Sequence, residues 1–391
     1  MKGPTFCAFL LAANIANSAS QPAQRAGRQT VRVCAAQPAS RLIDWRLKPA
    51  EALAQVDKSL GELEQIVHRA GAAGCDVLAL PEDTLGLLHW EMGNKAAMKD
   101  VLPEAVRRML DRLGRAAASH RMYLVCSNDL AEKDGTYRNL AFFLGRDGKE
   151  IGRYAKVHPT INESDRIRGR RFPVFETPDL GGVGLLICHD IKMPEATRAL
   201  ALGGADIIFL PTLGGAVMGG DPDAEGDLDR GAFRTRAVDN FVYLVVAKRG
   251  DGAMVISPQG TVLAEGKGPD GLAMADIDPF GGRAAGDALD FQRDMRARLF
   301  RERNPAAYGI LTDPNPPVLK KVPAEVTIEE AVRIGGKTLT IGEERFREAE
   351  VLSRAGKTSE AIRAFETLRA EFPRTWIDRA AQKRLAEIRK R

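Results

Sequence analysis

The segment GVGLLICHDIKMPEATRALAL, residues 182–202, places a chemically reactive side chain between a buried strand and a helix. Residues 183–187 are apolar at successive positions, which is typical of a strand that is buried on both faces. Pro194 is favoured at the first position of a helix, and a helical pattern runs from it to Leu202. We therefore expect Cys188 at the carboxyl end of a buried strand, where open α/β sheets bind their ligands.

The same alternation of strands and helices extends along much of the chain. We expect strands at residues 31–36, 76–80, 122–127, 183–187, 206–210 and 242–247, a hairpin of residues 140–144 and 151–155, and short strands near 254–257 and 262–264. We expect helices at residues 51–73, 101–119, 194–202 and 227–239. Helices that alternate with buried strands predict an α/β fold, and about 250 residues are enough for one such domain with a large core.

Two other apolar runs also end at residues with catalytic side chains. Glu82 follows the run 76–80 after one proline, and Lys156 directly follows the run 151–155. If these strand ends converge with that of Cys188, a thiolate can attack a carbonyl carbon while a carboxylate moves the proton and an ammonium stabilises the oxyanion. Taken singly, the same residues also fit an inert core thiol, a carboxylate at a helix start and a solvated lysine.

Five short motifs link these residues to a known family. They are LPE at 80–82, YAKVH at 154–158, GLLICHDIKMPE at 184–195, RTRAVDN at 234–240 and SPQG at 257–260. In this order, over roughly residues 30–300, they resemble the motifs of the carbon–nitrogen hydrolase (nitrilase) superfamily, in its amidase and carbamoylase branch. The resemblance implies a four-layer αββα sandwich.

The resemblance also implies roles for individual residues. Cys188 would be the nucleophile, Glu82 the base, and Lys156 the cation that stabilises the tetrahedral intermediate. The backbone N–H of His189 would help to form the oxyanion hole. Glu163 matches a second glutamate that orients the site in the family, although it fits a surface loop equally well.

Three positions depart from the family pattern. His189 stands where an aromatic residue is usual, Met193 where phenylalanine is usual, and Asp239 where glutamate is usual. The candidate catalytic residues are all retained, so we expect these changes to reshape the pocket rather than to alter its chemistry.

The nucleophile motif Cys188-His189-Asp190 favours amides or N-carbamoyl groups, because the nitrile-hydrolysing members of the superfamily look like Cys-Trp-Glu at this point. We expect hydrolysis of a non-peptide C–N bond through a cysteine thioester, without a metal or an organic cofactor. Two alternatives stay open. One is transfer of the acyl group to an amine, and the other is a non-catalytic scaffold that acts through the C-terminal helices.

Three further residues are candidates for binding the substrate. Lys192 and Arg198 flank the start of the helix after Cys188, and would bind a substrate carboxylate if they face the pocket. They fit a solvent-facing lysine and a salt-bridged arginine equally well. Asn139 fits either the pocket or a strand.

The five cysteines are Cys7, Cys34, Cys75, Cys126 and Cys188. No C-x-x-C pair occurs and no Cys/His group has the spacing of a zinc site, so the pattern argues against both a metal site and a disulfide scaffold. We expect Cys34, Cys75 and Cys126 to be core residues on or beside strands.

The two ends of the chain differ in character from the middle. Residues 1–20 begin with Lys2, an apolar run at 6–16 and small residues at 18–20, which predicts a signal peptide for export to the periplasm or the medium. The alternative is a wrongly chosen start codon and a cytoplasmic protein. We expect the hydrolase domain at residues 30–300 and a proline-rich linker or wrapping arm at 301–342.

Residues 343–391 are charged and helical, and resemble one tetratricopeptide repeat followed by a helix. The matching positions are Gly356, Ala361, Phe365 and Pro373. One repeat cannot bury its apolar face alone, so this small all-α addition must pack on the catalytic domain, on a sister subunit or on a protein partner.

Composition limits the other classes of partner. The chain has 391 residues, with 57 lysines and arginines against 52 acidic residues and a net charge of +5, so nucleic-acid binding is not expected. No apolar stretch reaches the roughly 20 residues of a spanning helix. We expect a small amide or N-carbamoyl compound as substrate and a homo-oligomer as the assembly.

Overall fold

Two six-stranded sheets form the centre of the computed structural model, which describes residues 30–39, 41–160, 163, 165–213, 228–250, 252–281, 295–321 and 328–389. The first sheet has the order β12 (Gly271–Ile277), β1 (Val31–Gln37), β2 (Val77–Ala79), β3 (Tyr123–Ala131), β4 (Tyr137–Leu144) and β5 (Glu150–Ala155). The second has the order β11 (Val262–Glu265), β10 (Met254–Ile256), β9 (Tyr243–Lys248), β8 (Ile207–Thr212), β7 (Gly181–Leu185) and β6 (Val174–Thr177).

Both sheets have parallel strands at the centre and antiparallel strands at the edges. β1, β2 and β3 are parallel neighbours, as are β7, β8 and β9. Central parallel strands are buried on both faces, which explains the continuous apolar runs in their sequences. Gly182 in β7 permits a close approach, because a Cβ atom there would lie 2.3 Å from the carbonyl oxygen of Gly204.

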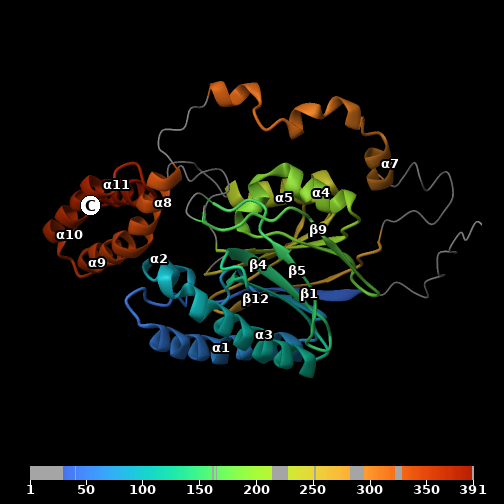
Figure 1. Ribbon diagram of the computed structural model, residues 1–391, viewed down its shortest axis with the longest axis horizontal. Coiled ribbons are helices and arrows are strands. Elements are labelled where there is room, and N and C mark those ends of the chain that lie inside the picture. The colour runs from blue at the N-terminus through green and yellow to red at the C-terminus, as the bar shows by residue number, and fades with distance from the viewer. Residues whose placement is uncertain are drawn as a thin grey trace, which may run out of the picture.

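Helices cover the outer face of each sheet (Figure 1). α1 (Pro49–Ala72) and α3 (Met98–Ser119) pack on the first sheet, and α4 (Pro194–Leu202) and α5 (Leu228–Asn240) on the second. The inner faces of the sheets share one apolar layer, in which Phe143 of the first sheet and Phe209 of the second are fully buried. The predicted four-layer αββα sandwich is therefore confirmed.

α1 shows how the sequence sets a helix boundary. Pro49 occupies the first turn, and the Glu51 carboxylate accepts the backbone N–H of Lys48 at 2.8 Å. Apolar residues at helical spacing, such as Val56 and Leu60, are fully buried against the first sheet. Burying one such side chain contributes about 1.5–3 kcal/mol, so packing rather than intrinsic propensity stabilises this helix.

The predicted strands and helices are present, apart from shifts of a few residues at their ends. The sequence did not predict β6, β12 or the short helix α2 (Leu88–Gly93). β12 contains an alternating and partly exposed pattern, and it exists as a strand because all seven of its residues pair with β1. Edge strands of this kind carry a weaker apolar signal than central ones.

A disulfide joins Cys34 in β1 to Cys75, which lies just before β2. Both residues are buried, as predicted, but no pattern in the sequence indicated the bond between them. The pairing follows from the parallel contact of β1 with β2, which brings together residues 41 positions apart. Cys126 and Cys188 are free, and Cys7 lies outside the described residues.

The chain continues beyond the sandwich through α7 (Met295–Arg301) and three short 3₁₀ turns (Pro305–Ala307, Gly309–Thr312 and Pro317–Lys320). It then forms α8 (Ile328–Lys337), a π-helical turn (Thr338–Gly342), α9 (Glu343–Arg354), α10 (Thr358–Glu371) and α11 (Trp376–Arg389). None of the helices among the described residues is long and apolar enough to cross a membrane.

Helices α9, α10 and α11 share a small core of their own, in which Phe365 and Ile377 are fully buried. This C-terminal unit lies beside α2, as Figure 1 shows, and Arg46 forms an ion pair of 2.6 Å with Glu344. It therefore packs on the catalytic sandwich, which is one of the alternatives that the sequence left open. The likeness to a tetratricopeptide repeat stays a prediction.

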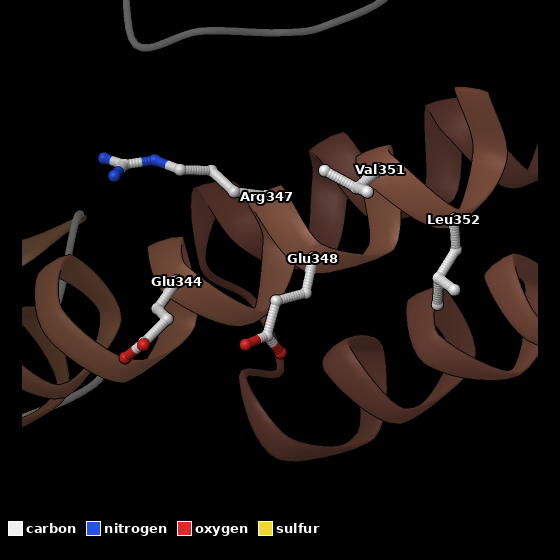
Figure 2. A pocket seen from close by; sticks show the side chains of 5 residues that line it. All are labelled: Glu344, Arg347, Glu348, Val351 and Leu352. Atoms are coloured by element: carbon white, nitrogen blue, oxygen red, sulfur yellow. The ribbon is translucent and has the colours of Figure 1, made fainter. Parts of the chain in front are cut away.

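One face of α9 retains a hollow of about 530 Å³ (Figure 2). Its lining is Glu344, Arg347, Glu348, Val351 and Leu352. Val351 is 64% exposed, so packing within the described part of the chain leaves this helix with some uncovered apolar surface. The predicted protein partner of the C-terminal helices stays a prediction.

Candidate active site

Four polar side chains meet at the end of the first sheet where β2 and β5 finish and β4 begins. Nζ of Lys156 lies 2.8 Å from Oε1 of Glu82 and 2.7 Å from Oε2 of Glu163. Nδ2 of Asn139 donates hydrogen bonds to Glu82 at 2.9 Å and to Glu163 at 2.8 Å. All four residues are at most 5% exposed, so the cluster is almost free of solvent.

Strand geometry explains why these residues meet. Glu82 follows β2 after Leu80 and Pro81, and Lys156 directly follows β5. Asn139 lies in β4, which pairs with β5, and its carbonyl oxygen accepts the backbone N–H of Lys156 at 2.9 Å. Strands β2, β4 and β5 of one sheet thus place a carboxylate, an amide and an ammonium within hydrogen-bond distance of one another.

Glu163 reaches the cluster from the segment after β5. Its Oε2 accepts the backbone N–H of Thr160 at 2.8 Å and the hydroxyl of Thr160 at 3.0 Å. These bonds and the contact with Lys156 fix the carboxylate on the inside of the protein. The alternative of a surface-loop residue is therefore wrong, because the side chain is only 6% exposed.

Cys188 lies at the turn between β7 and a five-residue 3₁₀ helix, Cys188–Lys192. Its φ of +42° is in the left-handed region, which costs about 1–3 kcal/mol for a residue other than glycine. The turn places the thiol beside the Glu82 carboxylate and the Thr212 hydroxyl, and both groups influence its pKa. The residue is partly exposed, unlike the charged cluster behind it.

Asp190 holds the nucleophile turn against the end of β5. Its Oδ2 accepts the backbone N–H of Ile187 at 3.0 Å and the hydroxyl of Tyr154 at 2.7 Å. Its Oδ1 lies 2.9 Å from the backbone nitrogen and 2.8 Å from Nδ1 of His158. One fully buried carboxylate therefore ties the segment that carries Cys188 to the segment that follows Lys156.

Burial and neighbouring charges set the protonation states of the clustered side chains. Burial and the charge of Glu163 raise the pKa of Glu82, although Lys156 opposes the shift. Burial disfavours the Lys156 ammonium, but the two carboxylates outweigh that effect and raise its pKa. Burial opposes ionisation of Glu163 too, yet Lys156 and bonds from Thr160 and Asn139 lower its pKa to about 2. The pair Lys156–Glu163 is therefore charged at neutral pH.

The Cys188 thiol is a weak acid in this surrounding. Burial and the charge of Glu82 raise its pKa to about 12, although Lys156 acts in the opposite direction. The thiol is protonated at neutral pH, so it needs a base to become a nucleophile. The Glu82 carboxylate is the candidate for that base, since it lies beside the thiol.

The sequence of the sandwich matches a known family. Residues 31–285 match the sequence profile of the carbon-nitrogen hydrolase family. The chain belongs to this family. It is an enzyme of the class that acts on non-peptide C–N bonds. The similarity to the family therefore covers the whole sandwich and not only the five short motifs.

Relatives of this carbon-nitrogen hydrolase include amidases. The deaminated glutathione amidase of Synechocystis sp. (strain PCC 6803 / GT-S) is 28% identical over 246 residues, which cover 57% of this chain and 86% of the relative. The (R)-stereoselective amidase of Pseudomonas sp. is 31% identical over 180 residues, which cover 43% of this chain and 62% of the relative.

Solved structures show the same fold. A mutant of the amidase from Nesterenkonia sp. AN1, with the acetamide moiety of fluoroacetamide added to its active-site cysteine, has a TM-score of 0.51 and 24% identity. That match covers 69% of this chain and 95% of the amidase. The C. elegans NitFhit protein has a TM-score of 0.56 and 21% identity, and the match covers 71% of this chain and 66% of that protein.

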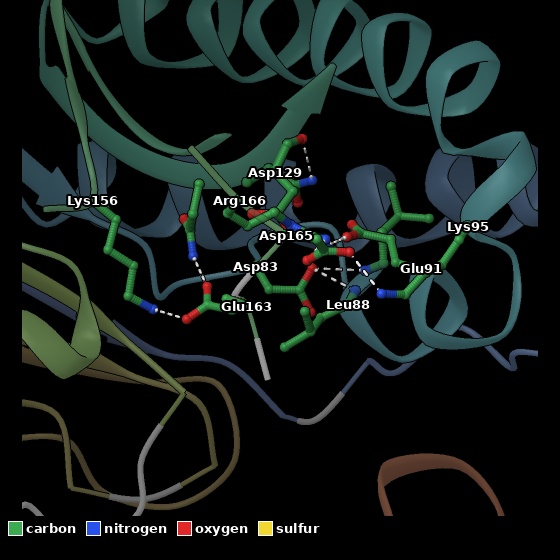
Figure 3. A network of polar contacts seen from close by, with 12 residues as sticks. Asp83, Leu88, Glu91, Lys95, Asp129, Lys156, Glu163, Asp165 and Arg166 are labelled. Atoms are coloured by element: carbon green, nitrogen blue, oxygen red, sulfur yellow. Dashed lines mark hydrogen bonds and ion pairs between the residues drawn. The ribbon is translucent and has the colours of Figure 1, made fainter. Parts of the chain in front are cut away.

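A second buried network borders the cluster of Glu82, Asn139, Lys156 and Glu163 in this hydrolase (Figure 3). The Arg166 guanidinium lies 2.6 Å from Glu91 and 2.6 Å from Asp129, and all three side chains are at most 4% exposed. The backbone N–H of Arg166 also donates to the carbonyl oxygen of Glu163 at 2.8 Å. The network therefore anchors the segment that carries Glu163.

The predicted substrate-binding residues lie in different places. Asn139 belongs to the cluster, but its amide nitrogen is occupied by Glu82 and Glu163. Lys192 is half-buried at the end of the 3₁₀ helix that begins at Cys188. Burial of His189 and the positive charge of Lys192 together lower the pKa of His189. Arg198 is not brought to the cluster. Its guanidinium donates to the carbonyl oxygen of Asp239 at 2.6 Å and lies over the Phe300 ring.

His189 is half-buried, and its backbone N–H is among the first of the 3₁₀ helix, where such groups lack partners within the helix. The position fits the oxyanion role that the family resemblance implies, which stays a prediction. Within the described residues, no group of three or more His, Cys, Asp or Glu side chains is arranged to hold a metal ion.

Three residues of the site were not predicted as functional. They are Thr212, Asp190 and Arg249. Thr212 lies beside the Cys188 thiol, and Asp190 accepts the backbone N–H of Ile187 just before it. Arg249 lies 3.0 Å from Asp83 and so holds the residue after Glu82 in place. Thr212 ends β8 and Arg249 follows β9. A search of all strand ends, of the kind that located Glu82 and Lys156, would therefore have found these two as well.

Proposed function

We propose that this protein hydrolyses an amide or N-carbamoyl bond through a thioester on Cys188. The observation that carries the proposal is the position of Glu82, whose carboxylate contacts both the Lys156 ammonium and the Cys188 thiol. One carboxylate can thus take the proton of the nucleophile while the neighbouring cation remains charged. The amidase relatives support amides as the class of substrate.

The first half-reaction forms the thioester. Glu82 accepts the thiol proton as Sγ of Cys188 bonds to the carbonyl carbon, and the carbonyl oxygen becomes an oxyanion. The Lys156 ammonium and the His189 N–H stabilise this charge, and a single donor of this kind contributes about 2.7–4 kcal/mol. The intermediate then collapses: Glu82 returns its proton to the nitrogen, and ammonia or an amine leaves.

The second half-reaction uses water. Glu82 takes a proton from water as its oxygen bonds to the thioester carbon, and the same cation stabilises the second oxyanion. Collapse breaks the C–S bond, the acid leaves, and the proton returns to Cys188. General acid–base help of this type contributes about 10²–10⁴-fold to the rate. The raised pKa of Glu82 suits the task, since a stronger base is needed for a thiol of high pKa.

Lys192 supports a more specific substrate class. It is half-buried at the end of the 3₁₀ helix that begins at Cys188, and its positive charge lowers the pKa of His189. We propose that it attracts a carboxylate on the substrate, which favours N-carbamoyl amino acids and ω-amides of dicarboxylates. A Lys192→Met variant should then raise KM for these acids and leave KM for uncharged amides unchanged.

The experiment is a panel of N-carbamoyl amino acids, ω-amides and simple nitriles, scored by release of ammonia. We expect release from one of the first two groups, with the Cys188→Ala variant as the inactive control. Addition of hydroxylamine to the active reaction separates hydrolysis from transfer: a hydroxamate reports a trapped thioester. Release from nitriles alone, or full activity of Cys188→Ala, would contradict the proposal.

We propose in addition that the protein works in an oxidising compartment. The buried Cys34–Cys75 disulfide and the apolar leader support this location, because disulfides persist mainly outside reducing cytosol. Fractionation of cells that express the full chain tests it. We expect a shortened protein outside the cytosol, whereas a full-length cytosolic protein with free thiols at both positions would contradict it.

A further inference from the structure

A wide groove lies where the two sheets end together. Its volume is about 1120 Å³, and its walls come from β4 and β5 of the first sheet, the segment 167–173, and Phe175 of β6. β5 and β6 are the outermost strands of their sheets among the described residues. The groove is separate from the cluster of Glu82, Lys156 and Cys188, none of which lines it.

Arginine dominates the charge of this groove. The lining includes five arginines, namely Arg138, Arg153, Arg168, Arg170 and Arg171. Glu132 is the single acidic residue among the lining side chains that the structure describes. We call this feature the arginine groove.

Two of the five arginines have acidic partners. Arg138 lies 3.6 Å from Glu132, and Arg153 lies 2.6 Å from Glu150. Both pairs are partly solvated, since the two arginine side chains are 29% and 44% exposed. Such pairs contribute little to stability, about 0–1 kcal/mol each, so their cations remain available to another anion.

The other three arginines differ in this respect. Arg168, Arg170 and Arg171 are exposed, and within the described ranges no carboxylate lies at ion-pair distance from their side chains. In contrast, Arg166 of the same run points inward to Glu91 and Asp129. Like charges on one wall repel each other, so these arginines do not favour the fold by themselves. A bound anion would relieve the repulsion and would be attracted by all three side chains.

Apolar side chains alternate with these cations. Ile167, which is 42% exposed, lines the groove together with Leu140, Phe172 and Phe175. The phosphate backbone of a nucleic acid pairs with cations but gains little from an exposed aliphatic side chain such as Ile167. A peptide with acidic and apolar residues satisfies both features, because its carboxylates pair bidentately with guanidinium groups and its apolar residues cover the walls.

The shape of the groove also fits an extended chain. It runs beside Arg153, Tyr154 and Ala155 of β5, the last strand of its sheet within the described residues. We propose that the arginine groove binds an extended acidic peptide segment of a partner protein. The inference goes beyond the hydrolase activity, since it assigns a docking surface on a different part of the sandwich.

Fluorescence anisotropy of a labelled peptide tests this proposal. The probe is a peptide of alternating glutamate and leucine, titrated with the full chain at low and at physiological salt. We expect saturable binding that weakens with salt and is about tenfold weaker or more in an Arg168→Ala/Arg170→Ala/Arg171→Ala variant. The same variant should keep wild-type amide hydrolysis, because none of its sites touches the catalytic cluster.

A matched control removes the same charge elsewhere. Arg107, Arg115 and Arg354 lie on other surfaces and are 65%, 71% and 79% exposed. Their triple alanine variant should bind the peptide like the wild type. Equal loss in both triple variants, no saturable binding, or tighter binding of a single-stranded oligonucleotide of equal charge would overturn the proposal. A change of oligomeric state in the groove variant alone would also overturn it, in favour of a contact between copies.

Discussion

Nζ of Lys156 lies 2.8 Å from Oε1 of Glu82, and neither side chain is more than 3% exposed. A buried ion pair of this kind is costly to break, because the remaining charge has no solvent around it. The same pair borders the thiol of Cys188, so in the proposed mechanism its charge state affects both the stability of the site and the reactivity of the thiol.

Replacement of Glu82 by glutamine should remove the base and keep the shape. We expect kcat to fall about 10²–10⁴-fold while KM changes little, because the amide cannot accept the thiol proton. Steady-state ammonia release measures both constants. Lys156 keeps Glu163 as its partner, so the variant should stay folded by circular dichroism, and wild-type kcat in a folded Glu82→Gln protein would refute the role of this base.

Removal of the cation should separate stability from catalysis. Lys156→Met leaves Glu82 and Glu163 buried without their shared partner, and we expect a loss of about 3–5 kcal/mol in the free energy of unfolding. The double variant Lys156→Met/Glu163→Gln removes one of the stranded charges. It should regain part of the stability in urea unfolding yet remain inactive, and recovery of activity in the double variant would speak against Lys156.

The pH dependence of kcat/KM should report Glu82. Burial and Glu163 raise the pKa of this carboxyl above the ordinary value of 4.5, and a protonated Glu82 cannot accept the thiol proton. Activity should therefore be lost as the pH falls through a value above 4.5, and be present on the alkaline side of it. An acidic limb centred at or below 4.5 would show that another group controls the reaction.

The Cys34–Cys75 disulfide should stabilise the first sheet without changing the rate of hydrolysis. Its loop spans 41 residues, and closure of a loop of this length contributes about 4 kcal/mol in the chain-entropy model. Cys34→Ala/Cys75→Ala should unfold at lower urea concentration and retain kcat. A reducing agent should shift the wild type toward the variant and leave the variant unchanged, and equal stability with and without the bond would contradict the prediction.

The fold could be predicted because central parallel strands are apolar throughout and end at chemically distinct residues. Glu82 and Cys188 come shortly after such strands, and Lys156 follows the antiparallel edge strand β5. The position of each residue after a strand indicated it as a candidate, and the family motifs then assigned the roles. β12 was missed because its side chains alternate between partly exposed and buried positions.

The rest of the site depends on contacts between distant segments. Asn139 was a candidate for substrate binding, but the pairing of β4 with β5 turns its amide toward two glutamates. The Cys34–Cys75 bond likewise depends on the parallel pairing of two strands. No local pattern in the sequence indicates which residues such pairings bring together.

The central claim is that the acyl group of the substrate is carried by Cys188. The most direct measurement is peptide mass spectrometry of the protein after acid quench during turnover of an active amide, with fluoroacetamide as a parallel covalent probe. We predict an acyl or acetamide group on the peptide that contains Cys188, none on buried Cys126, and loss of activity in proportion to labelling. Full turnover with Cys188 unmodified, or by the Cys188→Ala variant, would contradict it.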